Sequence, residues 1–192
     1  MENYVDPASM AENAGGVRLS REKFAELRDN ILKVSGAKKA YFNKQYKRIS
    51  QYLKNGDTQP AVVASVSPLI VSAYSDEMDA VVFLRFPDEL TAKYDLQTGT
   101  RLVTSCIYTS GDKIAKDIHT GPRYLEQFSD VTPVVQLFLS DEEAMIRART
   151  ELFNEDIWSR VTDLTEERAA QKNAPRDGFG YFTEFNLLFM IF

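Results

Sequence analysis

The hydrophobic pattern of this chain changes period once, near Gly56, and this change constrains the fold more than any motif does. Before it, apolar residues recur every three or four positions, as they do on one face of an α-helix. After it, short runs rich in Val and Ile alternate with polar turns as far as about residue 139. A helical pattern returns after that point. Because the helical segments gather at the two ends of the chain, the sequence predicts an α+β fold and not an alternating α/β fold.

The first helical segment predicts a helical hairpin over residues 18–56. Ser20 is placed to cap a first helix, and Gly36 is expected to end it by adopting a left-handed conformation. A second helix is expected over residues 37–54. The two apolar faces are formed by Phe24, Leu27, Ile31 and Val34 and by Phe42, Tyr46, Ile49 and Leu53. We expect the hairpin to pack these faces against the rest of the domain.

The middle of the chain predicts a mainly antiparallel sheet of about five or six strands, since the turns between the strands are short. A long helix is then expected from Ser140, with Glu143 completing a capping box, to about Lys172. The last strand is expected within residues 179–192. The strands before that helix are expected at residues 61–66, 69–74, 80–86, 100–109 and 134–139.

The composition of the two end segments, residues 1–17 and 179–192, indicates how the chain is divided into domains and in which compartment we expect the protein. Residues 1–17 are polar and small, which predicts a flexible arm before a single domain of residues 18–192. They do not have the pattern of a secretory signal peptide, and no apolar run is long enough to span a bilayer. We therefore expect a cytoplasmic protein that does not enter a membrane. The apolar run of residues 179–192 fits either a covered strand of the core or a strand offered to a partner's sheet.

Charge is distributed unevenly along the sequence. Residues 18–54 hold 11 of the 23 basic residues and 3 of the 28 acidic ones, a local charge of +8, which leaves the remainder at −13. On a helical wheel, four basic residues of the second helix fall within about 120° of each other, opposite its apolar face. They are Lys44, Lys47, Arg48 and Lys54, with Tyr41 and Tyr52 at the border of the basic face.

Three interpretations of this basic face remain open. It is a solvated surface that pairs with the acidic part of the same molecule, a docking surface for an acidic protein, or a nucleic-acid surface with tyrosines that stack on bases. A sequence pI near 5.0 disfavours non-specific binding to a polyanion by the whole protein. We therefore place protein ahead of nucleic acid as the partner.

The only histidine, His119, is the one residue suited to general base catalysis near neutral pH. Asp117 or Asp112 lies near it in sequence and is placed to orient it, and Arg123 is placed to hold an anion. The same stretch, which contains Gly121-Pro122, also has the composition of an ordinary turn. A small hydrolase centred on His119, Asp117 and Arg123 is therefore an alternative hypothesis.

Other catalytic and cofactor signatures are not found in the sequence. There is no phosphate-binding loop, no dinucleotide-binding glycine pattern and no nucleophile elbow. The single cysteine, Cys106, lies in an apolar run and excludes both an internal disulfide and a cysteine-rich zinc cluster. We expect no metal and no cofactor. The sequence favours a non-catalytic protein-binding module of the accessory, inhibitor or immunity type, with the hydrolase and the nucleic-acid-associated factor as alternatives.

Overall fold

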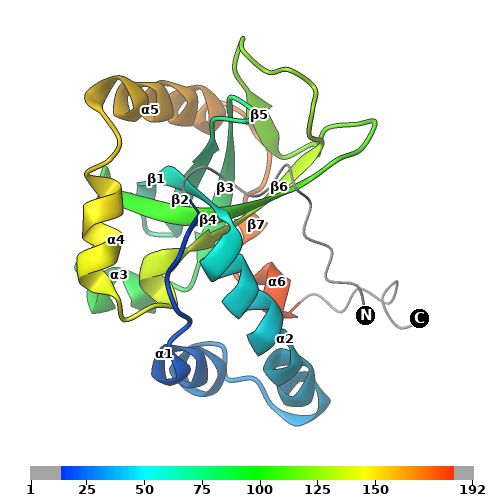
Figure 1. Cartoon of the computed structure of the whole chain (residues 1–192), viewed down its shortest axis with the longest axis vertical. Helices are drawn as coiled ribbons and strands as arrows, with labels where there is room; N and C mark the ends of the chain where they lie inside the picture. Colours follow the sequence, from blue (N-terminus) through cyan, green and yellow to red (C-terminus); the bar gives the residue numbers. More distant parts are fainter. Residues whose placement is uncertain (1–13, 184–192) are drawn as a thin grey trace.

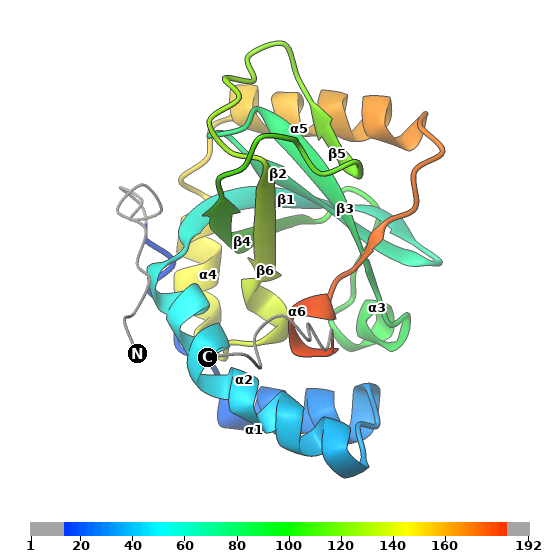
Figure 2. The same cartoon turned by 90° about the vertical axis from the view of Figure 1, so that its right-hand side faces the viewer.

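The computed structural model describes residues 14–183 and confirms the α+β class. A curled sheet lies in the middle of the molecule, with helix α5 (Glu155–Ala169) on one side and helices α1 (Arg21–Glu26) and α2 (Gly36–Asn55) on the opposite side (Figures 1 and 2). Residues 1–13 of the expected arm lie outside the described residues. Residues 14–17 lie against the body, where Ala14 forms a β-bridge with Asp57 and Val17 is fully buried.

The N-terminal helices form a hairpin as expected, with one correction at the turn. Ser20 caps α1, and its side chain accepts a hydrogen bond from the backbone N–H of Lys23 at 3.2 Å. The helix continues as a π-helical turn, η2 (Leu27–Ile31), and ends there, so Gly36 does not terminate it. Lys33, with φ 49°, takes the left-handed conformation between the helices, and Gly36, with φ 58°, begins α2.

The sheet is antiparallel except for one short strand. Its strands run in the order β5-β3-β2-β1-β4-β6, and β7 pairs in parallel with β3. The bounds are β1 (Asp57–Val66), β2 (Leu69–Ser75), β3 (Ala80–Phe86), β4 (Arg101–Thr109), β5 (Ile118–Thr120), β6 (Asp130–Val135) and β7 (Arg176–Asp177). A short helix, α3 (Glu89–Lys93), follows β3, and a 3-10 turn, η3 (Gln136–Phe138), follows β6.

The curl of the sheet brings its two edges together at β7. Arg176 of β7 donates to the carboxylate of Asp117, just before edge strand β5, with Nη2 and Oδ1 2.9 Å apart. The same guanidinium donates to the backbone carbonyl of Val131 in the opposite edge strand β6 at 2.8 Å. Arg176 therefore links both edges of the sheet. Its contacts cover part of the backbone that the edge strands of an open sheet leave exposed.

The expected single helix from Ser140 to Lys172 is wrong: two helices occupy this region. Helix α4 (Glu143–Thr150) begins after Glu142, and the Ser140 hydroxyl accepts from the backbone of Glu142 instead of capping a longer helix. Helix α5 has its own cap, because the side chain of Asn154 accepts from the N–H of Ile157 at 3.0 Å. Asn is a strong N-cap residue, so it starts a new helix where the apolar spacing alone suggests continuity.

The C-terminal strand is also corrected where the structure describes it. Residues Gly180–Thr183 form a short helix, α6, and the rest of the expected strand lies outside the described residues. Phe182 of α6 is fully buried and stacks on Phe42 of α2, with ring centroids 4.5 Å apart. Phe24 of α1 packs against Phe42 at 4.9 Å. This aromatic contact holds the hairpin against the body.

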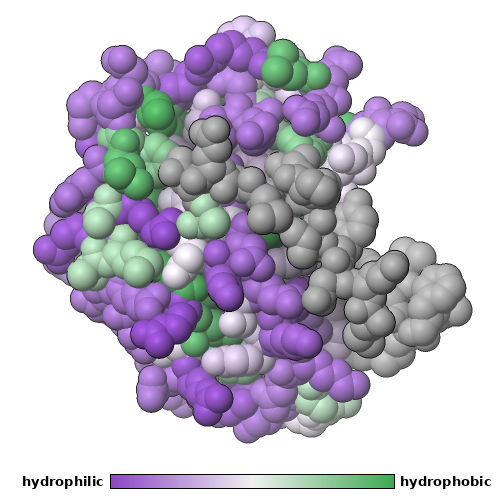
Figure 3. Space-filling model, viewed as in Figure 1, coloured by the Kyte–Doolittle hydropathy of each residue, from purple (hydrophilic) through white to green (hydrophobic). Residues whose placement is uncertain are grey.

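A single main core fills the space between the sheet and the helical hairpin. It includes Ile49 and Leu53 of α2, both fully buried, and Cys106 of β4. A smaller cluster around Trp158 and Val161 packs α5 onto the other side of the sheet. No helix within residues 14–183 is long and apolar enough to cross a membrane. The face of the molecule seen in Figure 3 is mainly hydrophilic where residues are coloured, with hydrophobic residues in small areas.

Candidate functional site

The lysines expected to bind a partner lie on the outer side of α2. Lys44, Lys47 and Lys54 are exposed, while Phe42 and Ile49 of the same helix are fully buried. At about 100° per residue, the buried side lies opposite Lys44. None of these three lysines forms an ion pair with a described residue.

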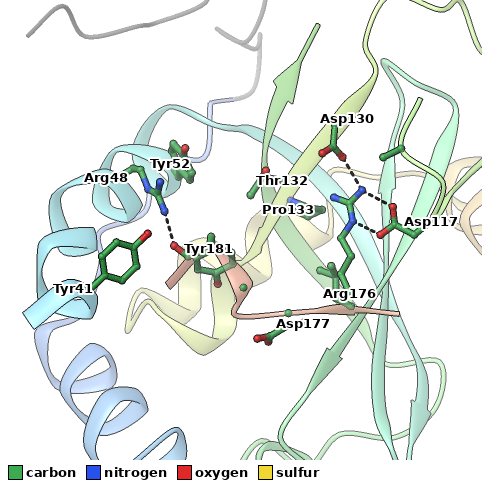
Figure 4. A pocket seen from close by; sticks show the side chains of 14 residues that line it. Tyr41, Arg48, Tyr52, Asp117, Asp130, Thr132, Pro133, Arg176, Asp177 and Tyr181 are labelled. Atoms are coloured by element: carbon green, nitrogen blue, oxygen red, sulfur yellow. Dashed lines mark hydrogen bonds and ion pairs between the residues drawn. The ribbon is translucent and has the colours of Figure 1, made fainter. Parts of the chain in front are cut away.

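Arg48, Tyr41 and Tyr52 lie on a different part of the same helix surface. They fall within about 40° of each other on the helical wheel, between the lysines and the core. All three are half-buried and line one wall of a cavity of about 520 Å³ (Figure 4). The guanidinium of Arg48 lies 5.9 Å from the ring of Tyr52 and donates through Nη2 to the backbone carbonyl of Tyr181 in α6. The helical wheel groups these residues with the lysines, whereas the structure divides the group between an exposed face and a cavity.

The opposite wall of the cavity comes from the strand edges joined by Arg176. Asp117, Asp130 and Asp177 line it together with Arg176 and Tyr181. Arg176 donates to Asp117 and to Asp130, the latter at 2.7 Å. Burial by itself raises the pKa of Asp117, but hydrogen bonds from Arg176 more than offset this and hold that pKa below its ordinary value. Asp117 is therefore an ionised partner of Arg176 at neutral pH.

Arg48 differs from Arg176 in having no carboxylate partner among the described residues. Its Nε is buried and meets no hydrogen-bond acceptor. Buried donors in folded proteins are almost always satisfied, so a buried arginine nitrogen without an acceptor calls for an explanation. The cavity thus has one wall with an uncompensated positive group and one wall on which carboxylates outnumber the arginine.

The hydrolase hypothesis concerns His119, Asp117 and Arg123, and each of them contacts different residues. No hydrogen bond or ion pair joins any two of the three in the described structure. The Nε2 of His119 lies 2.9 Å from a carboxylate oxygen of Glu167, and Gln171 Nε2 lies 2.7 Å from its Nδ1. Asp117 pairs with Arg176, as described above. Arg123, whose side chain is 68% exposed, donates its backbone N–H to Asp79 at 2.9 Å.

Asp79 is the centre of a polar network that the sequence did not reveal. Its side chain is 3% exposed and accepts two hydrogen bonds from Arg160 of α5, at 3.0 and 2.6 Å. Burial favours the neutral acid, yet the bonds from Arg160 and from the backbone of Arg123 hold the pKa of Asp79 below its usual value. The network fastens α5 to the turn before β3, which is a structural role.

A second buried acid, Asp57, lies at the start of β1. Tyr108 donates to its carboxylate at 3.0 Å, and Gln59 donates to both Asp57 and Asp76. The pKa of Asp57 is raised to about 6, mainly by burial and also by the charge of Asp76, and the hydrogen bonds from Gln59 and Tyr108 oppose this rise. The group lies away from the cavity beside α2, whose lining does not include it.

Sequence reasoning missed the residues that complete the cavity, because they come from segments distant in the chain. Asp130, Arg176 and Asp177 carry no motif, and only the curl of the sheet brings them opposite α2. Within residues 14–183, no cluster of three or more metal-ligating side chains is placed to hold a metal ion. Comparison with protein-family models, curated proteins and solved structures finds no match.

Proposed function

We propose that the protein is a non-catalytic interaction module of the cytoplasm, and that the outer side of α2 docks an acidic surface of a partner protein. The observation that carries this proposal is a group of exposed, unpaired lysines on one face of α2. Lys44, Lys47 and Lys54 are exposed on one helix face and have no ion-pair partner among residues 14–183. We propose a regulatory or inhibitory role for such docking.

Some other basic residues of the N-terminal region are paired within the molecule, whereas Arg21, Lys33 and Lys38 form no ion pair with a described residue. Arg18 forms an ion pair with Glu142 at 2.8 Å, and Lys23 lies 3.7 Å from Asp141. These two contacts are ion pairs between the basic segment and the acidic remainder, and they lie around α1. Lys44, Lys47 and Lys54 of α2 form no ion pair with a described residue, so internal pairing does not account for these three lysines.

The acidic surroundings of α2 favour protein over nucleic acid as the partner. The far wall of the neighbouring cavity carries Asp117, Asp130 and Asp177 against the single Arg176. The protein as a whole has a net charge of −5. A continuous polyphosphate chain that extends past α2 would meet repulsion from the carboxylates of the cavity wall, whereas a folded partner can present its carboxylates to the lysines alone.

Site-specific crosslinking tests the proposal. A photoreactive amino acid is placed at Lys44, at Lys47, or at Asp163, an exposed position on α5 on the other side of the molecule, and the protein is irradiated in extract of its native host. We expect the same polypeptide to be crosslinked from Lys44 and Lys47 but not from Asp163. No crosslinked polypeptide at either lysine, the same yield from all three positions, or adducts that a nuclease removes would contradict the proposal.

A further inference from the structure

A second cavity lies between the helical hairpin and α6, and we call it the hairpin cavity. Its volume is about 330 Å³. Its lining includes Phe42 of α2 and Phe182 of α6, both fully buried, together with the half-buried Leu32, Val34 and Tyr41. In both views α6 lies beside α2 (Figures 1 and 2). The half-buried side chains leave apolar surface that another apolar group can cover.

The residues that follow α6 in the sequence are strongly apolar. Seven of the nine residues 184–192 are Phe, Leu, Met or Ile. Because the removal of apolar side chains from water is favourable, such a run is stabilised by an apolar surface against which it can pack. Phe185 is three residues beyond Phe182, so their Cα atoms are at most about 11 Å apart. Since Phe182 lines the hairpin cavity, Phe185 is within reach of it.

The charged residues beside the hairpin cavity match the one charge of this segment. Lys33 and Lys38 line the cavity and are exposed, and neither forms an ion pair with a described residue. Glu184 is the only charged residue of 184–192, and it directly precedes Phe185. Its carboxylate can therefore meet a lysine at the surface while the uncharged residues after it enter the cavity without the cost of burying a charge.

We propose that residues 184–192 dock in the hairpin cavity of the same chain, with Phe185 against Leu32 and Val34 and with Glu184 facing Lys33 or Lys38. This inference goes beyond the proposed function, because it concerns contacts within one chain and does not depend on a partner at α2. Docking covers an apolar run that would otherwise be available for association with other chains. It also joins the loop between the two hairpin helices to α6.

Photocrosslinking within the purified protein tests the inference. A photoreactive amino acid is placed at Ser35, which lines the cavity and makes no capping hydrogen bond to α2, or at Lys44 outside the cavity as the control. After irradiation, a protease that cleaves after glutamate separates residues 185–192 from Phe182. We expect mass spectrometry to detect an adduct with residues 185–192 from Ser35 and not from Lys44. No such adduct from Ser35, or equal yields from the two positions, would overturn the inference.

Isotope labelling distinguishes docking within one chain from docking between two copies. Equal amounts of nitrogen-15-labelled and unlabelled protein are incubated together before irradiation. An adduct within one chain joins two labelled or two unlabelled peptides, whereas an adduct between copies also joins one of each. We expect only adducts within one chain. Mixed adducts would show that the segment of a second copy fills the cavity, which contradicts the inference.

Two neighbouring variants test the role of Phe185. Phe185→Ser removes the first apolar side chain after α6 and is expected to lower the yield of the adduct roughly tenfold, whereas Asn186→Ser is expected to leave it nearly unchanged. Methyl NMR adds a second measurement. We expect the Val34 methyl signals to shift in Phe185→Ser, because an aromatic ring leaves their surroundings, and the signals of Val81 under α5 to stay in place. Equal yields from the two variants, or unmoved Val34 signals in Phe185→Ser, would also contradict the inference.

Discussion

The carboxylate of Asp79, which precedes β3, accepts two hydrogen bonds from Arg160 of α5, and this pair fixes the helix across the sheet. Each partner comes from a region whose role could not be read from the sequence. Tyr74 adds a third side-chain donor at 3.3 Å, and the backbone carbonyl of Asp79 accepts from Gly121 at 2.6 Å. Asp79 therefore forms hydrogen bonds that join the turn before β3, helix α5 and the loop after β5.

We predict that Asp79→Ala destabilises the protein by about 3–5 kcal/mol, because it leaves the donors of Arg160 and Arg123 without their buried acceptor. Urea unfolding at neutral pH measures the change. Arg123→Ala is the control, since its exposed side chain reaches Asp79 only at 3.5 Å and an exposed pair contributes about 0–1 kcal/mol. A similar small loss for both variants would show that the network does not hold α5.

We predict that Asp57→Asn stabilises the protein above pH 7. Its folded-state pKa of about 6 lies above the unfolded value of about 3.9, so folding retains a proton that the unfolded chain releases. The stability contributed by the protonated acid is present below about pH 4 and is lost as the pH rises through 6. The variant avoids this loss, and we expect a gain of up to about 2 kcal/mol at pH 8 and little change at pH 4. Thermal melts at both pH values test this, and destabilisation at pH 8 would contradict it.

We predict that the hairpin contributes to the stability of the whole domain. Phe42→Ala and Ile49→Ala are each expected to cost about 2–5 kcal/mol, because both side chains are fully buried against the body. Gln51→Ala changes an exposed position of the same helix and serves as the control. Melting curves that stay in place for both core variants would mean that the hairpin is a separate appendage.

We predict that His119→Ala leaves partner binding intact and lowers stability by at most about 1 kcal/mol. The imidazole contacts Glu167 and Gln171 near the end of α5, which are surface interactions of modest value. Calorimetry for stability and a binding titration for function check the two parts. A hundredfold loss of any activity in a folded variant would instead favour the hydrolase hypothesis.

Much of the architecture follows from local patterns in the sequence. The apolar spacing of Phe42 and Ile49 predicts α2, and the run of residues 80–86 predicts β3 to the residue. The missed break between α4 and α5 has a local signal as well, because Asn154 is followed by Glu155 and Asp156, which favour a helix start. The spacing of apolar residues alone does not report such a cap.

Only part of the candidate site could be predicted from the sequence. The basic outer side of α2 follows from helical periodicity, so Lys44 and Lys47 are placed correctly on the surface. The cavity depends on the curl of the sheet, which brings Arg176 and Asp130 opposite Arg48. No periodicity encodes contacts between residues about 80 to 130 positions apart, and the split of the basic face into exposed lysines and a half-buried arginine therefore needed the structure.

The most direct test of the account is the salt dependence of binding between this protein and the polypeptide crosslinked from α2. Wild type is compared with the triple variant in which Lys44, Lys47 and Lys54 are each replaced by Gln. We predict roughly tenfold weaker binding by the variant, a flatter dependence on salt and an unchanged melting temperature, since exposed unpaired lysines contribute little to folding. Equal affinities for the two proteins, or submicromolar binding of wild type to unspecific DNA or RNA at physiological salt, would contradict the account.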